Sequence, residues 1–209
     1  MADNAYATVD ELKDFLCLAD NDRDYALDNI VTTASRLIDR WTGHQFYSVS
    51  AQVRYFEWLP GSDVNFLKVD DLLSLTELAT DSNGDGVYET VWTTGTDYYL
   101  WPVNAVAKNE PFTRIYRSTF NGRFYFPAYP RGVRITGTWG YATATPAPIK
   151  QLCLIVSQCI AGPLLDMSIP GVSSYKLGSD IYVTMTPAVL PQEARWLLSL
   201  YGDQTFVVI

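Results

Sequence analysis

The chain has 209 residues, of which 48% are hydrophobic and 18% charged, and its formal net charge is −8. This length is typical of one domain, or of one domain with a large insertion, and it allows a sizeable core without disulfides or metal ions. The aromatic content of 14% argues against disorder. The negative charge argues against a protein that coats nucleic acid over its whole surface.

The charges are distributed unevenly along the chain. Residues 1–28 have a net charge of −6 and residues 29–100 another −6, whereas residues 101–150 carry seven basic residues against Glu110 and reach +6. Residues 151–209 contribute the remaining −2. An acidic start and a basic middle predict two faces of opposite potential, which in an assembly could meet across neighbouring copies. The alternative is that solvated charges simply fall unevenly.

No targeting or membrane segment is predicted. The first ten residues have no basic flank and no apolar run, so they do not form a signal peptide. Polar residues and a Gly-Pro pair interrupt the longest apolar stretch, which is too short to cross a bilayer. Cys17, Cys153 and Cys159 fall in apolar helical patterns, which predicts buried free thiols and synthesis in the cytoplasm.

Two helices are predicted within the first 43 residues. Thr8 and Glu11 form a capping-box pattern, and an apolar stripe follows them to residue 16. A longer helix is predicted to begin near residue 22 or 24, where carboxylates suit the positive end of the helix dipole. Its apolar residues follow a period of 3.6 before Gly43, which is a natural stop.

Between residues 51 and about 141 the apolar period changes to two residues, which predicts strands. The pairs Asn83-Gly84 and Asp85-Gly86 favour a hairpin turn. No helix-start signal is seen in this region. The expected strands cover residues 52–58, 72–78, 87–92, 98–101, 113–116, 123–126 and 133–139.

The helical pattern returns at residues 149–160 and is expected to end or kink at Pro163. A loop with a short hairpin around Gly178 and Ser179 follows, and a last helix is predicted from Pro187 or Pro191 to Tyr201. The flanking helices are too short and too amphipathic to be stable alone, so we expect them to pack together across the strand region.

The predicted fold class is α+β, with a small helical bundle core of about four helices interrupted by a large antiparallel β insertion. The core comprises residues 1–48 and 142–202, with a hairpin loop at 168–186. The insertion comprises residues 49–141, and an extended C-terminal tail covers residues 203–209.

The chain shows no pattern typical of an active site. His44 is the single histidine and lies beside a helix-ending glycine, and no nucleophile elbow, phosphate-binding loop, dinucleotide fingerprint or Cys-x-x-Cys pair occurs. Cys153 and Cys159 have no histidine near them in the sequence, which argues against zinc. We therefore expect no enzymatic activity, no cofactor and no metal site.

One segment has a weak likeness to a calcium loop. Asp81, Asn83 and Asp85, followed by Gly86, copy the first half of an EF-hand loop. The twelfth position is Trp92 instead of a bidentate glutamate, and strands flank the segment. A polar hairpin turn is therefore the favoured interpretation, with a cation-binding turn as the alternative.

Basic and aromatic residues alternate between residues 114 and 134. This composition could stack nucleotide bases and follow phosphates. It also suits a twisted antiparallel sheet with an aromatic inner face and an arginine outer face, which is the favoured interpretation. The candidate basic and aromatic face is defined by Arg114, Arg117, Arg123 and Arg131.

The last residues form an uncharged, β-branched segment after a helix stop. Such a segment needs a sheet edge for its backbone amides. Addition as a strand to another subunit or protein would supply one, and folding back on the chain's own sheet is the alternative. The candidate residues are Thr205, Phe206, Val207, Val208 and Ile209.

Four segments in this order resemble tailed-bacteriophage head–tail connector proteins, also called adaptor or head-completion proteins. They are ATVDELKDFL (7–16), ASRLIDRWTG (34–43), RGVRITGTWGY (131–141) followed by PIK (148–150), and PGVSSYKLG (170–178). The resemblance rests on their order and spacing. The central residues 51–130 form a longer insertion than a minimal adaptor needs.

The resemblance implies a non-enzymatic structural protein of the virion neck, between the capsid portal and the tail. Such adaptors form a ring under the portal, commonly of twelve copies and in some cases only once the portal is present. They extend the channel for genomic DNA without sequence recognition, they dock the next neck, stopper or tail-completion protein, and they involve no membrane.

Two sets of residues receive roles from this resemblance. Residues 205–209 would bind the portal as a strand. A hairpin that lines the channel or joins subunits would contain Ser173, Ser174, Tyr175, Lys176, Leu177 and Gly178. The alternative function is a virion-surface or tail-associated β-rich module that recognises carbohydrate through its aromatic sheet.

Overall fold

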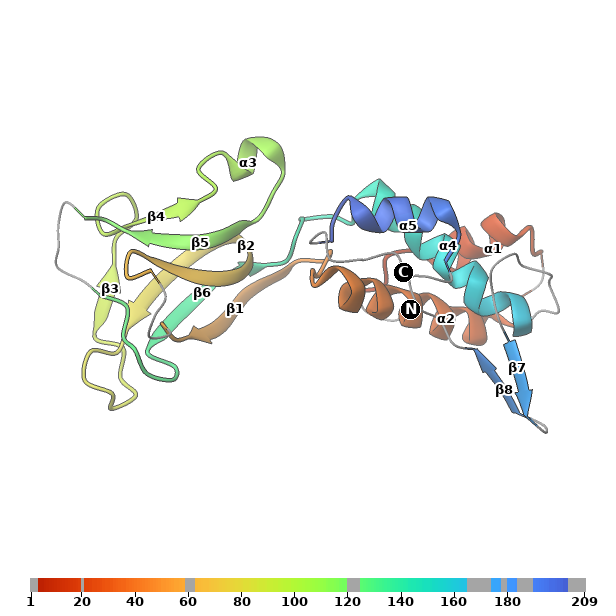
Figure 1. Cartoon of the computed structure of the whole chain (residues 1–209), viewed down its shortest axis with the longest axis horizontal. Helices are drawn as coiled ribbons and strands as arrows, with labels where there is room; N and C mark the ends of the chain where they lie inside the picture. Colours follow the sequence, from red (N-terminus) through yellow and green to blue (C-terminus); the bar gives the residue numbers. More distant parts are fainter. Residues whose placement is uncertain are drawn as a thin grey trace. The chain divides into compact units, whose positions relative to one another are not determined.

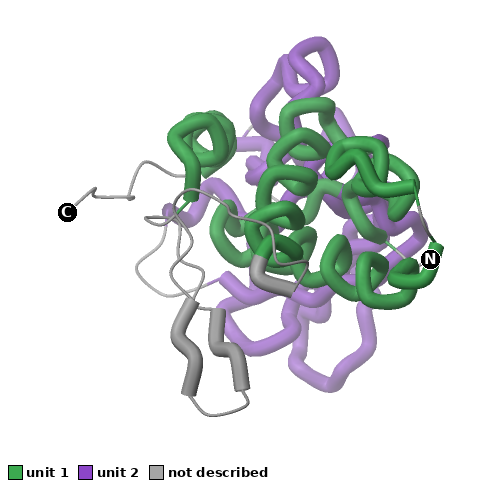
Figure 2. Tube along the Cα trace, turned by 90° about the vertical axis from the view of Figure 1, so that its right-hand side faces the viewer, with its two compact units in different colours: residues 1–46, 145–209 green, residues 47–144 purple. Residues whose placement is uncertain are grey.

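The computed structural model describes residues 4–19, 21–58, 63–119, 125–164, 174–177, 180–183 and 190–202. The chain divides into two compact units (Figure 2). Met1–Phe46 and Thr145–Ile209 form the first, called the helical unit below, and Tyr47–Ala144 form the second, called the sheet unit. The fold is therefore mixed α/β, with its six-stranded antiparallel sheet in the second unit (Figure 1).

The described part of the helical unit contains four helices. They are α1 (Val9–Leu16), α2 (Asp24–Thr42), α4 (Ala147–Leu164) and α5 (Gln192–Ser199). The helix α2 packs against α4, α1 contacts both of them, and α5 contacts α4 and α2. The strands β7 (Ser174–Leu177) and β8 (Asp180–Val183) form an antiparallel pair on either side of residues 178 and 179, where the sequence predicts a short hairpin.

Local signals place the ends of α1 and α2. The hydroxyl of Thr8 accepts from the Glu11 N–H, and the Glu11 carboxylate accepts from the Thr8 N–H, so the predicted capping box is present. The helix α2 ends at Gly43, whose φ of +75° is left-handed. The expectation of a buried Cys17 was wrong: this residue is the exposed, left-handed C-cap of α1, just beyond the apolar stripe.

A polar network around Tyr6 lies inside the helical unit. The Tyr6 hydroxyl donates to the Asp39 carboxylate and accepts from the Phe46 N–H at 2.9 Å. The Tyr6 N–H donates to the Ser35 hydroxyl at 3.0 Å. Burial raises the pKa of Tyr6 far above its usual value and also raises the pKa of Asp39. The network ties the N-terminal segment to the C-terminal half of α2 and to the residues that follow this helix.

Both ends of the chain contribute to this unit. On α4, the Lys150 ammonium lies 2.7 Å from the Glu11 carboxylate of α1. This hydrogen bond is the main reason that the pKa of Glu11 is lowered. The Cys153 thiol lies 3.5 Å from the Ser35 hydroxyl of α2. Apolar side chains of α1, α2 and α4 surround these contacts, among them the fully buried Leu12, Ile38, Ile149 and Leu152.

All paired strands of the sheet unit are antiparallel, in the order β1-β6-β2-β5-β4, with β3 beside β2. The strands are β1 (Val49–Phe56), β2 (Phe66–Thr80), β3 (Thr90–Trp92), β4 (Tyr98–Trp101), β5 (Phe112–Arg117) and β6 (Val133–Trp139). The predicted strands at 98–101 and 133–139 are confirmed at these bounds. One face buries a core that includes Leu67, Leu78, Ile115, Ile135 and Trp139.

The fifteen-residue strand β2 is the centre of the sheet and extends well beyond the predicted 72–78. Its first residues pair with β5, its later residues with β6, and its last three with β3. The register shifts in both long pairings, at bulges that allow the strand to bend. A single strand therefore connects all parts of the sheet unit (Figure 1).

Two details of the sheet unit differ from the prediction. A four-residue helix, α3 (Ala105–Lys108), lies between β4 and β5, although no helix-start signal precedes it. Tyr125 and Phe126, from the strand predicted at 123–126, have irregular backbone, and residues 123 and 124 lie outside the described residues. Phe126 stacks on Trp92 at 4.9 Å between ring centroids, so a loop delivers this side chain to the core.

Gly137 allows β6 and β2 to approach closely. A Cβ atom at this position would lie 2.3 Å from the Ser74 carbonyl oxygen and 3.0 Å from the Leu72 side chain. The nearest obstacle is backbone, which cannot rotate away. This position therefore requires glycine for space.

We expect Gly137→Ala to lower the free energy of unfolding by about 1–3 kcal/mol, because the added methyl group forces β2 and β6 apart. Urea denaturation followed by tryptophan fluorescence measures the change. Thr136→Ala, on the same strand, is the matched control, and it should lower the free energy of unfolding by less than Gly137→Ala does. An unchanged unfolding midpoint for Gly137→Ala would show that the β2 backbone moves at little cost.

Candidate functional site

The face of β2, β5 and β4 that points away from the core carries a row of aromatic side chains. Phe66, Tyr116 and Tyr99 occupy paired positions on these three strands. The ring centroids of Phe66 and Tyr116 lie 5.3 Å apart, and Trp101 packs edge-on against Tyr116 at 6.0 Å. Tyr99 and Trp101 remain 50% and 44% exposed. These four residues are called the aromatic ladder below.

Two basic side chains occupy the next row of the same face. Lys68 pairs with Arg114 across β2 and β5, and Arg114 pairs with Trp101 across β5 and β4. The Arg114 guanidinium lies 5.0 Å from the centre of the Phe66 ring. Both cations are exposed, and the ion pairs found among the described residues involve other basic side chains. Like charges at paired positions are unfavourable.

The structure does not bring the predicted arginines together on one face. Arg117 is three residues beyond Arg114 and projects from the opposite face of β5. It stacks on Tyr125 at 4.6 Å and donates to the Asn65 side chain at 3.2 Å. Arg123 lies outside the described residues. Of the described arginines in the predicted set, Arg114 is the one beside the aromatic ladder.

Arg131 belongs to a separate cluster near the far end of β2. It lies 4.2 Å from the centre of the Tyr55 ring, which in turn lies 6.0 Å from Tyr88. Arg134 stacks on Tyr88 at 4.7 Å and pairs with the Glu77 carboxylate at 2.7 Å. These contacts join two loops to β1, β2 and β6, so this cluster stabilises the sheet unit.

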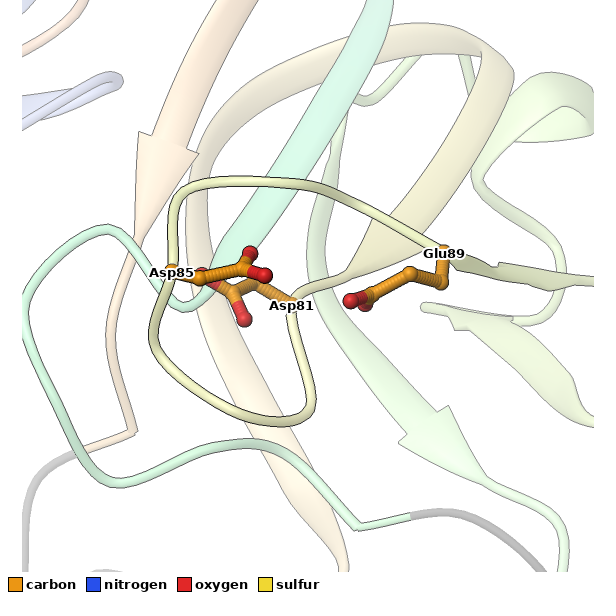
Figure 3. A group of neighbouring side chains, drawn as sticks. All are labelled: Asp81, Asp85 and Glu89. Atoms are coloured by element: carbon orange, nitrogen blue, oxygen red, sulfur yellow. The ribbon is translucent and has the colours of Figure 1, made fainter.

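The turn between β2 and β3 is organised by Asp81 (Figure 3). Its carboxylate accepts hydrogen bonds from the N–H groups of Asn83, Gly84 and Gly86 at 3.1, 2.7 and 2.8 Å. Desolvation opposes ionisation, but the bonds from Gly86, Gly84 and Asn83 outweigh it and lower the pKa of Asp81. The predicted polar hairpin turn is therefore present.

Asp85 and Glu89 bring two further carboxylates to this turn (Figure 3). Ligand atoms of Asp81, Asp85 and Glu89 lie within 4.8 Å of one another. Glu89 could not be predicted as part of this group, because it lies outside the segment that follows the calcium pattern. The Asp81 oxygens already accept backbone hydrogen bonds, which accounts for their position without a cation.

The remaining reactive side chains form no reaction centre within the described residues. His44 packs beside Phe46, with 6.1 Å between ring centroids. Burial raises the pKa of the Cys153 and Cys159 thiols, which makes them poor nucleophiles at neutral pH. Beyond the Asp81 turn, no cluster of three metal-ligating side chains occurs in the described ranges.

Two other predicted sites fall largely outside the described residues. The tail strand at residues 205–209 is not among them, and neither are Ser173 and Gly178 of the hairpin. The hairpin residues Ser174–Leu177 form β7. In the part of the chain that is described, no helix has the length and apolar character needed to cross a membrane.

The fold is similar to that of chains in the necks of phage-like particles. A chain from the neck of a native gene transfer agent (GTA) particle, computed with C12 symmetry, matches with a TM-score of 0.52 and 16% identity, covering 93% of this chain and 87% of that chain. A chain from the neck of an empty GTA particle, computed with C6 symmetry, matches with a TM-score of 0.51 and 16% identity, covering 93% and 88%. No protein-family model and no curated protein matches the chain. At this identity the likeness establishes a shared fold.

We expect Asp81→Asn to destabilise the sheet unit at neutral pH, because the neutral amide has one acceptor oxygen for three N–H groups. The lowered pKa means that this carboxylate stabilises the fold above its unfolded pKa of about 3.9, and that the effect is lost as the pH falls through its folded value.

Thermal unfolding midpoints at pH 7 and near pH 3 measure this effect. The difference between wild type and Asp81→Asn should narrow in acid, whereas the control Glu110→Gln should follow the wild type at both pH values. A difference that stays constant with pH would show that the charge of Asp81 does not stabilise the turn.

Proposed function

We propose that this chain is a structural protein of the neck of a phage-like particle, a head–tail connector (adaptor) that forms a homo-oligomeric ring under the portal. The observation that carries the proposal is the fold shared over 93% of the chain with chains from symmetric particle necks. The four connector-like sequence segments support it independently of the fold.

The proposed mechanism is assembly, without bond chemistry. The ring would extend the channel for genomic DNA and present a docking surface to the next neck, stopper or tail-completion protein. The net charge of −8 suits this role, because a net-acidic wall repels phosphate and lets DNA slide without sticking. The dispersed titratable side chains agree with a structural role.

In this proposal the tail at residues 205–209 binds the portal. The hairpin at residues 173–178 makes contacts between subunits of the ring or lines the channel. The uncharged, β-branched tail suits strand addition to a sheet edge of another protein. The pair β7 and β8 supplies a ready-made hairpin for the second role.

Negative-stain electron microscopy of the purified protein, alone and mixed with the portal of the same particle, tests the proposal. We expect rings or additional density beneath the portal in the mixture. Because adaptors can remain monomeric until the portal templates them, the mixture is the decisive sample. A chain that remains a monomer, ignores the portal and binds a glycan array would instead support the carbohydrate-binding alternative.

Deleting residues 205–209 should abolish portal attachment and leave the fold intact, because the tail would supply the strand that pairs with the portal. Co-sedimentation with portal measures attachment, and circular dichroism checks the fold. A variant of equal length with residues 205–209 replaced by Gly and Ser separates loss of sequence from loss of length. Normal attachment of both variants would contradict strand addition.

A further inference from the structure

A subunit of a closed ring needs two different contact surfaces, whereas a subunit of a symmetric dimer needs one. Each copy in a closed ring of more than two members contacts its neighbours through two different surfaces, and these must be complementary. In the proposed ring, on which this inference rests, two different surfaces of this chain must therefore fit each other.

The first surface is the exposed face of α1. Asp10 and Asp14 lie four residues apart on this eight-residue helix, so their side chains are neighbours on one face. Both are exposed, whereas the other acids nearby are engaged: Glu11 pairs with Lys150, and Asp24 pairs with Lys13 at 3.0 Å. A like-charge pair at this spacing is mildly destabilising within the chain.

The second surface is the row beside the aromatic ladder. Lys68 and Arg114 are exposed at paired positions on β2 and β5, and this like-charge pair is also unfavourable within the chain. The acid nearest to Lys68 along β2 is Asp70, and it is held by Arg54 at 2.8 Å. An anion from outside the chain would relieve the repulsion between the two cations.

The two surfaces match in charge and in spacing. Side chains four apart on a helix have Cβ atoms about 5–6 Å apart, and paired residues on antiparallel strands have Cβ atoms about 4.5–5.5 Å apart. Two carboxylates can therefore face two cations in one contact. The exposed rings of Tyr99 and Trp101 lie beside that contact and provide apolar area, which aromatic side chains commonly do at protein interfaces.

We propose that Lys68 and Arg114, with the adjoining aromatic ladder, bind the Asp10 and Asp14 face of α1 of the next copy in the ring. Each copy contributes its α1 to one neighbour and its ladder face to the other. Both unfavourable like-charge pairs are neutralised only in the assembly, which favours the ring over the free subunit.

A charge-swap experiment tests this contact. The basic-side variant is Lys68→Glu with Arg114→Glu, and the acidic-side variant is Asp10→Lys with Asp14→Lys. In each variant alone, both surfaces carry charge of the same sign. We therefore expect the number of rings on the portal to fall by about tenfold or more. Each variant replaces one like-charge pair by a like-charge pair of the opposite sign. The acidic-side variant also loses a favourable carboxylate in the first turn of α1, and the basic-side variant loses the stacking of Arg114 on Phe66. Because these positions are exposed we expect both variants to fold, and circular dichroism checks this.

A one-to-one mixture of the two variants should restore the rings. When the variants alternate, every contact again joins acidic to basic side chains, and any ring with an even number of copies can close. The matched control is Lys108→Glu with Arg195→Glu, which changes the net charge as much as the basic-side variant does at exposed positions elsewhere, and it should assemble normally. Failure of the mixture, with both variants folded, would overturn the proposed contact.

Crosslinking provides a second readout on unmodified protein. A carbodiimide joins amines to carboxylates that touch, so Lys68 should couple to Asp10 or Asp14 in assembled rings. Mixing ¹⁴N- and ¹⁵N-labelled protein shows by mass spectrometry whether the linked peptides come from different copies. Rings that form without this crosslink would count against the contact.

The outcomes separate this inference from the proposed function. Wild-type protein that forms no ring with portal contradicts the adaptor itself. Wild-type rings together with normal rings of the basic-side variant overturn only the contact. If that variant forms normal rings but loses binding of a fluorescent DNA duplex in an anisotropy assay, the basic row is a DNA surface and the inference is wrong.

Discussion

The packing of α1 and α2 against α4 is the contact on which the helical unit depends, and it joins the segments that precede and follow the sheet unit. The Glu11–Lys150 pair and the contact between Ser35 and Cys153 bridge segments separated by the whole sheet unit. Forming such a contact closes a long loop, and the lost conformational entropy opposes folding until the contact is made. A sheet unit that folds by itself lowers that cost, because it shortens the loop to a compact body. The Tyr6 network then adds directional contacts that apolar packing alone does not supply.

Local patterns predicted much of the secondary structure and little of its geometry. The capping box at Thr8, the stop at Gly43 and the alternation over 133–139 depend on neighbours in sequence, and all three are present. The length of β2 could not be predicted, because bulges within it break the alternation on which the prediction depends. The composition of residues 123–126 predicts a strand. Phe126 instead lies in a loop, and from there its side chain packs against Trp92 in the core.

Local sequence patterns predicted even less of the candidate site. Four arginines spread over residues 114–131 suggested one basic face, but strand alternation sends Arg114 and Arg117 to opposite faces of β5, and stacking on Tyr55 places Arg131 in another cluster. The residue that lies opposite Arg114 is Lys68, on a strand distant in the sequence. Only the register of β2 against β5 brings the two cations together. No local pattern contains that register.

Unneutralised like charges at paired positions have a consequence for assembly. In a free subunit the two charges of each pair repel each other, and solvent and salt keep the energetic cost of that repulsion small. In a ring the same charges would be partly desolvated between copies, where attraction of opposite signs is stronger and screening is weaker. A net charge of −8 adds general repulsion between copies. In the proposed ring, assembly would require the correct local contact together with a template that raises the local concentration of subunits, and a portal in that role would keep rings from forming away from it.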